Sequence, residues 1–246
     1  MNKTVQYILV MIFLVSVGHA KVLDAAYSVS YGIFGQLGVS TAHLETSKNS
    51  YVIEISARTT GIVKKLSRNR QEKYISKGHI VNGILISDSL RMIRSYGDKY
   101  SEKIYRTDHR KKKVTKTYIA RKKGKIYKNE TKELAFYSQD DLLTLYFNLP
   151  KKIDLSKAGT YEIGAVGAEK QDGKVTIIVP DMDRRSIYEK ILGKGNFRYL
   201  TAIVYQKIFE SNKGELMIAV GKDNIAQKAV LKDLVLYGDL VVERIK

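Results

Sequence analysis

The chain has 246 residues and no cysteine, which excludes disulfide bonds and the acylated cysteine that anchors lipoproteins. Lysine and arginine number 43 against 25 aspartates and glutamates, so the formal net charge is +18. Such an excess favours association with anionic partners and carries no information about the fold.

The first twenty residues have the three-part pattern of a secretory signal peptide. A lysine precedes an apolar stretch at 7–17, and Gly18 and Ala20 occupy the −3 and −1 positions of a cut after Ala20. The alternative is an uncleaved membrane anchor, but a spanning helix needs about 20 apolar residues and this stretch is shorter. We therefore expect residues 1–20 to be removed and residues 21–246 to form a single exported, β-rich domain in the periplasm.

Alternation of apolar and polar residues dominates the remaining chain, as expected of half-buried strands. Tyr27, Val29 and Tyr31 alternate with serines, and turns rich in glycine and polar residues separate this run from those that follow. Short turns between such runs predict antiparallel pairing. The predicted strands cover residues 27–31, 39–44, 51–57, 72–76, 90–96, 100–106, 114–121, 161–168, 175–179, 199–209, 215–220 and 235–243.

A leucine-rich segment at 139–149 departs from this pattern, because its apolar side chains share one helical face. Asp140 or Asp141 can cap the start of this helix, and Pro150 is predicted to end it. The helix is too apolar to lie in water. We expect it to pack inside the concave face of a curved sheet, with a cavity beside it as an option.

A second short helix is predicted at about 181–192, ended by Gly193, and a helical turn at 60–66. These elements predict a mainly β fold, all-β or α+β. Its architecture would be a curved antiparallel sheet or half-open barrel packed on a central helix at about 139–149.

Several short sequence motifs, taken in order along the chain, resemble those of the exported bacterial family called domain of unknown function 3108. The resemblance implies an envelope location and a β-rich fold, and it supplies no activity. The chain departs from the family pattern in two places: it has no proline at 225–229, and it has an elaboration at 181–195. The motifs are YSVSYG at 27–32, GVSTA at 38–42, SARTTG at 56–61, QDDLLTLYF at 139–147, GELMI at 214–218 with Asp223, and GDL at 238–240.

The candidates for catalysis are few. His43, His79 and His109 lack the close spacing of a zinc site. Asp140 and Asp141 could share acid and base roles, but at a helix start we expect these carboxylates to cap free amides and to stabilise the helix dipole. No nucleophile elbow or phosphate-binding loop occurs in the sequence. We therefore predict no enzyme, and no catalytic, cofactor-binding or metal-binding residue.

The basic segment at 103–128 is the strongest local feature, with tyrosines interleaved among its charges. We expect the charges around its two turns to form one positive lip that binds anions. The alternative is a solvated hairpin whose lysines protect exposed strand edges. The candidate anion-binding residues are Arg110, Lys111, Lys112, Lys113, Lys116, Arg121, Lys122, Lys123 and Lys125.

The expected function is non-enzymatic binding of an amphipathic or anionic envelope ligand, either a lipid or an anionic envelope polymer. Export argues against a nucleic acid partner. The alternatives are a structural or assembly partner of another envelope protein, and a hydrolase that uses Asp140, Asp141 and the histidines.

Overall fold

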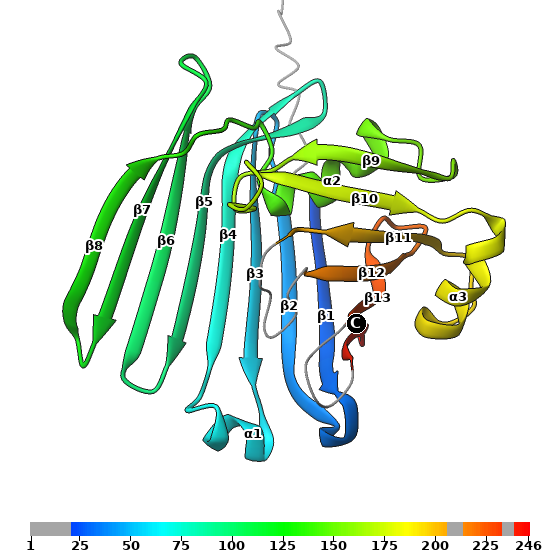
Figure 1. Ribbon diagram of the computed structural model, residues 1–246, viewed down its shortest axis with the longest axis horizontal. Helices are drawn as coiled ribbons and strands as arrows, with labels where there is room; N and C mark the ends of the chain where they lie inside the picture. Colours follow the sequence, from blue (N-terminus) through cyan, green and yellow to red (C-terminus); the bar gives the residue numbers. More distant parts are fainter. Residues whose placement is uncertain (1–20, 206–213, 233–238) are drawn as a thin grey trace, which may run out of the picture.

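The computed structural model describes residues 21–205, 214–232 and 239–246. The predicted signal peptide lies outside the described residues, as do parts of two predicted strands, at 206–209 and 235–238. Within the described residues, fourteen strands form one antiparallel sheet (Figure 1). This confirms the prediction of a mainly β, antiparallel protein. No helix in these ranges is long and apolar enough to cross a bilayer.

The first eight strands form a meander in which each strand pairs with the next one along the chain. Short turns join them, and two of these turns contain helical segments, η1 (Gly32–Phe34) and α1 (Gly61–Leu66). The strands are β1 (Lys21–Tyr31), β2 (Gln36–Thr46), β3 (Ser50–Thr59), β4 (Gln71–Val81), β5 (Ile84–Tyr96), β6 (Lys99–Asp108), β7 (Lys113–Lys122) and β8 (Lys125–Glu133).

The remaining six strands form a second meander, and its last strand pairs with the first strand of the chain. Helix α2 (Leu142–Lys152) precedes this meander, and helix α3 (Met182–Leu192) interrupts it. The strands are β9 (Gly159–Gly164), β10 (Lys174–Val179), β11 (Arg198–Ile203), β12 (Glu215–Val220), β13 (Ala226–Leu231) and β14 (Leu240–Arg244).

The sheet is strongly curved but does not close. Its order runs from β8 through β1 and β14 to β9, so β8 and β9 are the two free edges. Figure 1 shows β9–β12 crossing in front of β1–β3, so the sheet folds back over itself. The sheet is therefore half-open, and it has two faces that can enclose a core.

Alternate residues of the second meander face this core, as the period of two requires. Ile177, Leu200 and Ile218 lie in neighbouring strands and belong to one buried cluster. Leu145 and Leu149 of α2 are part of the same cluster and are each 3% exposed. The largest apolar cluster is thus built from β10–β13 together with α2.

Helix α2 begins as the sequence predicts. The Asp141 carboxylate accepts hydrogen bonds from the backbone N–H groups of Leu143 (2.7 Å) and Thr144 (2.9 Å), and the Thr144 hydroxyl accepts one from the Asp141 N–H. This reciprocal pair is a capping box. The predicted stop at Pro150 is wrong, because Ile153 N–H still donates to the Leu149 carbonyl (2.9 Å) across the proline. The helix therefore continues to Lys152.

The other two helical predictions are confirmed. Helix α3 starts at an Asp181 cap, whose carboxylate accepts from the Arg184 N–H at 2.8 Å. It ends at Gly193, which has a φ of +92°, a conformation that glycine adopts without steric cost. The predicted turn at 60–66 is α1.

Two strands escape the sequence analysis. All nine residues of β8 are exposed, so no buried face produces an alternating pattern. The short strand β13 lacks alternation too, since its last three residues are all buried. The predicted strand at 161–168 is also shorter than expected, since β9 ends at Gly164 and Val166 forms an isolated parallel bridge with Asp141.

Candidate functional site

A cavity of about 1070 Å³ lies on the inner face of β3–β8, next to the start of α2. The strand register explains its lining, because residues that pair across neighbouring strands point to the same face. Met92 of β5 lies opposite Tyr74 of β4 and Lys103 of β6, and Lys103 lies opposite Tyr118 of β7. A second hollow of about 420 Å³ near Phe197 is smaller and more open to solvent.

One end of the large cavity is apolar. Leu90, Met92, Leu142 and Leu143 line it, together with the backbone of Gly167. A side chain at Gly167 would place its Cβ 2.9 Å from both Leu90 and Met92, and the residue has a φ of +101°. Glycine here therefore lets the loop after β9 approach the sheet closely.

The rest of the lining is strongly basic. Six cationic residues face the cavity against two anionic ones, Glu72 and Glu130. The carboxylate of Glu169, which lies just outside the lining, neutralises one further positive charge of the cavity. Among the described residues, Lys132 has no ion-pair partner. The cationic residues are Arg70, Arg94, Lys103, Lys116, Lys128 and Lys132.

Glu72 holds two of these cations in place. It is buried and pairs with Arg70 at 2.6 Å and with Arg94 at 2.9 Å, while the Tyr74 hydroxyl donates to its second oxygen. Burial raises the pKa of the Glu72 carboxyl, but the Tyr74 hydrogen bond and the two guanidinium groups outweigh it and lower the pKa. The carboxylate is therefore ionised and fixes both arginines.

Glu169 organises a second cationic group. It accepts hydrogen bonds from Lys116 (2.6 Å), Lys103 (3.2 Å) and the Tyr105 hydroxyl (2.6 Å). Burial raises its pKa, but the hydrogen bonds from Lys116 and Tyr105 and the charges of the two lysines outweigh burial and lower the pKa to about 2. Burial also lowers the pKa of the Lys116 ammonium, and the contact with Glu169 only partly restores it.

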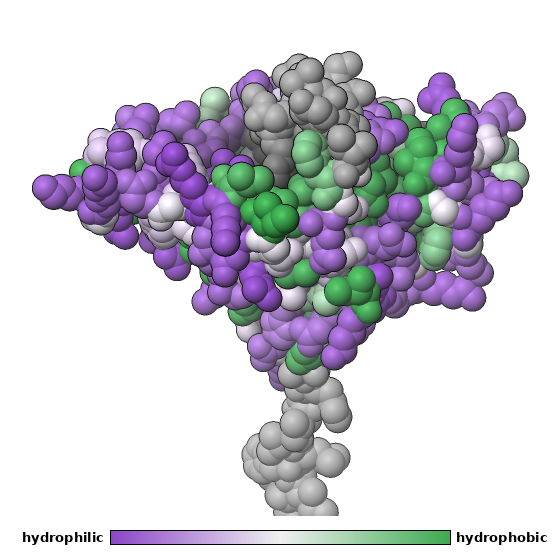
Figure 2. Space-filling view, turned by 90° about the horizontal axis from the view of Figure 1, so that it is seen from below, coloured by the Kyte–Doolittle hydropathy of each residue, from purple (hydrophilic) through white to green (hydrophobic). Residues whose placement is uncertain are grey.

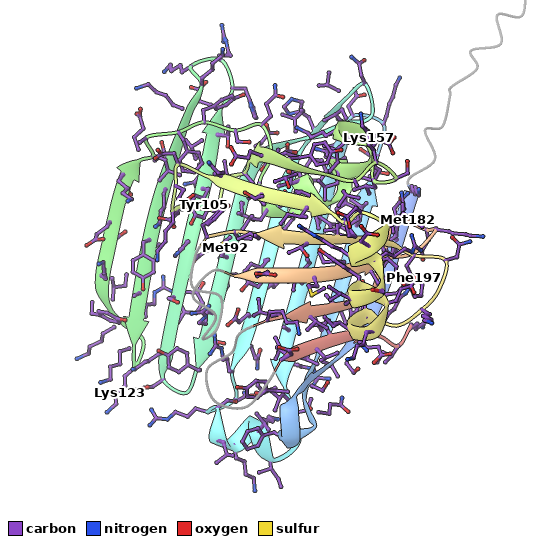
Figure 3. All side chains as sticks on the ribbon, turned by 45° about the vertical axis from the view of Figure 1, so that its right-hand side comes forward. Met92, Tyr105, Lys123, Lys157, Met182 and Phe197 are labelled. Atoms are coloured by element: carbon purple, nitrogen blue, oxygen red, sulfur yellow. The ribbon has the colours of Figure 1, made fainter. Side chains whose placement is uncertain are left out.

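The expected positive lip does not form, and this corrects the sequence interpretation. The β6–β7 turn carries Arg110–Lys113, whereas the β7–β8 turn carries Arg121–Lys125, at the opposite end of β7. Ten residues of strand at about 3.3 Å each separate the two groups by roughly 30 Å. Figure 3 shows Lys123 at the tip of its hairpin, far from Met92 and Tyr105. Of the nine candidates, Lys116 alone lines the cavity.

The other five cations of the cavity were missed as candidate site residues: Arg70, Arg94, Lys103, Lys128 and Lys132. Strand register brings the strand members together: Lys132 lies opposite Lys116, and Arg94 lies opposite both Glu72 and Ser101. Arg70 directly precedes β4 and pairs with Glu72. The pairing of β8 with β7 was not predictable, because β8 itself gave no strand signal.

Asp140 and Asp141 lie in the core. The Asp140 carboxylate contacts Asn148 Nδ2 at 2.6 Å and Lys152 Nζ at 2.5 Å. Asp141 caps α2 with one oxygen and accepts from the Ser87 hydroxyl (2.7 Å) with the other. Burial raises the pKa of the Asp141 carboxyl, and its hydrogen bonds only partly offset this. Capping by Asp141 is thus confirmed.

The three histidines separate into two groups. His43 lies on β2 with its Nδ1 atom 2.7 Å from Asp24. His79 and His109 both lie beside Asp88. Sequence spacing could not reveal this second group, because its members come from β4, β5 and the β6–β7 turn.

No model of a known protein family matches the chain, and no curated protein matches it. One similar solved structure is described as a beta-barrel-like protein of domain of unknown function DUF1849 from Brucella abortus. The superposition covers 91% of this chain and 95% of that chain, with a TM-score of 0.52 and 13% sequence identity. This likeness supports the β-barrel-like fold alone. The resemblance to domain of unknown function 3108 stays a prediction.

Proposed function

We propose that the protein is a non-enzymatic carrier or receptor for an amphipathic, anionic ligand of the cell envelope, held in the large cavity. The observation that carries this proposal is the pairing of an apolar end with a rim of six cations in one cavity. Ligand sites are concave and mostly apolar, with a few polar groups that fix orientation. A lipid with an anionic headgroup matches both parts of the lining.

The central helix belongs to this proposal. Asn148 of α2 binds both backbone groups of Leu85 in β5, at 3.0 Å and 2.8 Å, which supports a helix held against the inner face of the sheet. Leu142 and Leu143, in the first turn of α2, close the apolar end of the cavity. In this scheme α2 completes the site, and an acyl chain packs against its first turn.

The cationic rim supplies the headgroup contacts. Lys132 is the best placed, since it has no ion-pair partner in the described ranges. Lys103 and Lys116 are already held by Glu169, so an incoming phosphate or carboxylate would share them. The proposed location in the periplasm would bring the cavity near phospholipids and lipopolysaccharide.

One end of the sheet is suited to contact a membrane. Ile62 and Leu66 of α1 are each 79% exposed, and Phe34 in the neighbouring β1–β2 turn is 54% exposed. Lys64 and Lys65 lie between the two α1 residues. Figure 2 views this end and shows apolar patches among hydrophilic residues. Apolar side chains flanked by lysines are typical of surfaces that bind anionic bilayers.

The predicted cations Arg121, Lys122, Lys123 and Lys125 lie at this same end. Backbone hydrogen bonds join three consecutive turns there: Gly97 N–H to the Arg68 carbonyl (2.6 Å), and Lys123 N–H to the Asp98 carbonyl (2.9 Å). We propose that these charges attract the anionic membrane from which the ligand is taken. In this proposal these residues bind anions at the end of the sheet that faces the membrane, away from the cavity.

The cavity is tested with a fluorescent fatty acid and its uncharged methyl ester, titrated into the purified protein. We expect the acid to bind more tightly, and Lys132→Glu to weaken the acid about tenfold, or 1.4 kcal/mol, while binding of the ester is unchanged. The control is Lys157→Glu, an exposed lysine away from the cavity (Figure 3). Equal affinity for acid and ester, or no binding of either, would remove the proposal.

The membrane contact is tested by flotation with vesicles of phosphatidylcholine alone or mixed with phosphatidylglycerol. The double variant Ile62→Ser/Leu66→Ser should lose binding to the mixed vesicles. Ile187→Ser on α3, a residue that is 55% exposed, is the matched control. Flotation that is independent of the anionic lipid would contradict this part.

A structural or assembly role is the second candidate. Strand β8 is a free edge with all nine residues exposed, and such an edge can accept a strand from a partner. Crosslinking in cells would then give one dominant protein partner, while the fatty acid titration would be blank. The hydrolase alternative lacks similar support, because Asp140 and Asp141 are both held in buried bonds.

A further inference from the structure

We propose that His79, Asp88 and His109 form a binding site for a divalent transition metal of the zinc class. The three residues come from β4, β5 and the β6–β7 turn, and none of them lines the cavity. One nitrogen from each histidine and a carboxylate oxygen of Asp88 all lie within 4.8 Å of one another.

The distances fit a shared metal ion. His79 Nδ1 lies 2.9 Å from Asp88 Oδ1, and His109 Nε2 lies 3.1 Å from the same oxygen. Ligand atoms around a tetrahedral zinc ion, with bonds of about 2.0–2.1 Å, are roughly 3.3 Å apart. Only small side-chain movements would therefore admit the ion. Two imidazoles that contact one carboxylate oxygen could also form two ordinary hydrogen bonds, but two further features of the structure favour a metal ion.

A β-bulge supplies the first support. Lys77 pairs with Ser89 and Gly78 with Ser87, so Asp88 is an extra residue in β5. A side chain at Gly78 would place its Cβ 1.9 Å from the Ile86 carbonyl oxygen, so the bulge requires glycine there. Bulges redirect side chains and are frequent beside functional sites. Here the bulge brings Asp88 within reach of His79.

Tyr137 supplies the second support. Its hydroxyl lies 3.0 Å from His109 Nδ1, and the two rings meet edge to face with centroids 5.9 Å apart. A proton on Nδ1, donated to this hydroxyl, leaves the Nε2 lone pair free for a metal. Partners of this kind fix the tautomer and the orientation of metal-binding histidines. Tyr137 is thus a positioning residue.

The site has room for one more ligand. The side chains of His79, Asp88 and His109 are 43%, 48% and 23% exposed, so solvent reaches the ion. Three protein ligands with an open fourth position are typical of zinc that binds water or a further group. Since His109 lies in the β6–β7 turn, the bound ion would tie this turn to β4 and β5.

The proposal is tested by titrating Zn²⁺ into the metal-free full chain in competition with a chromophoric chelator. We expect one equivalent to bind, and Co²⁺ to give the visible absorption of a tetrahedral nitrogen and oxygen site. His109→Ala and Asp88→Asn should each weaken Zn²⁺ binding by at least tenfold. Tyr137→Phe should weaken it about tenfold, within the range for lost outer-shell partners.

The matched control is His43→Ala. His43 also lies beside an aspartate, at 2.7 Å from Asp24, but no second histidine shares that carboxylate in the described residues. Its loss should leave Zn²⁺ binding unchanged. Circular dichroism of each variant checks that the fold is intact. The proposal is overturned if the wild-type chain binds no Zn²⁺, or if folded His109→Ala binds it as tightly as the wild type.

Discussion

At the scale of single residues, buried and half-buried carboxylates hold the cationic side of the cavity in place. Glu169 gathers two lysines and a tyrosine hydroxyl, and its side chain is only 21% exposed. Clustered lysines would repel one another without this anion. The carboxylate therefore stabilises the fold and also sets the positions of the charges that we propose to bind the ligand.

Glu169 makes the free energy of unfolding depend on pH. Its pKa of about 2 in the folded protein is below its ordinary value of 4.5. Its contribution is therefore complete above pH 4.5 and is lost as the pH falls towards 2. We expect Glu169→Gln to lower the free energy of unfolding at pH 7 by about 2 kcal/mol and to flatten the pH dependence between 4.5 and 2.

Urea unfolding at several pH values measures this effect. Glu162→Gln is the control, because Glu162 is 59% exposed and pairs with Lys174 at the surface. Exposed pairs contribute at most about 1 kcal/mol, so this variant should retain the wild-type acid profile. A Glu169→Gln variant with the same profile as the wild type would contradict the prediction.

Asp141 has a different role, since it is fully buried and satisfies two backbone amides at the start of α2. We expect Asp141→Ala to lower the free energy of unfolding by about 2–3 kcal/mol, because those amides and the Ser87 hydroxyl lose their acceptor. Asp181→Ala removes the exposed cap of α3 and should cost about 1 kcal/mol or less. Urea unfolding of both variants measures the two effects. Equal losses of unfolding free energy would show that burial of the cap does not increase its contribution to stability.

At the scale of elements, one polar side chain of α2 bonds directly to the backbone of β5, in addition to the apolar contacts of Leu145 and Leu149 with the second meander. Asn148 uses its amide to satisfy Leu85 N–H and carbonyl groups, and it also donates to Asp140. Asn148 is 1% exposed, so water cannot replace these bonds. The amide side chain of Asn148 thus pairs with β5 in the way that the backbone of a neighbouring strand would.

We expect Asn148→Leu to lower the free energy of unfolding by about 2–4 kcal/mol, because two backbone groups of Leu85 become buried without partners. Ligand binding in the cavity should weaken as well, since α2 closes its apolar end. The control is Asn129→Ala on β8, which is exposed and should change stability by less than about 0.5 kcal/mol. Unchanged unfolding of Asn148→Leu would show that other contacts hold α2.

At the scale of the whole molecule, the pairing of β1 with β14 joins the two meanders. Val242 lies opposite Val29 on one side and opposite Ala229 on the other. The contact between Val29 and Val242 joins residues from opposite ends of the described chain. The half-open shape, and with it the cavity, therefore depends on the pairing of strands from opposite ends of the domain.

Substituting Val242 by proline or by alanine distinguishes the contribution of the backbone pairing from that of side-chain packing. Val242→Ala keeps the backbone hydrogen bonds, whereas Val242→Pro removes a donor from a strand paired on both sides. We expect the proline variant to be less stable than the alanine variant by about 1–3 kcal/mol in urea unfolding. Equal stability of the two variants would show that the β1–β14 ladder adds little.

The sequence by itself determined the local elements. Alternating residues marked most strands because each has one buried face, and the acidic pair at 140 and 141 marked the start of α2 because a cap acts on its own backbone. Strand β8 gave no signal because both of its faces are exposed. The proline at 150 led to a wrong prediction of the end of α2, because helical hydrogen bonding resumes beyond it.

Only the tertiary structure decided which charges share a surface. The basic segment splits between two ends of β7, while Arg94, Lys103 and Lys132 converge with Lys116 from neighbouring strands. His79, Asp88 and His109 meet in the same way, through a bulge. The physical reason is that register and curvature arise from pairings between distant segments, and spacing along the chain does not encode those distances.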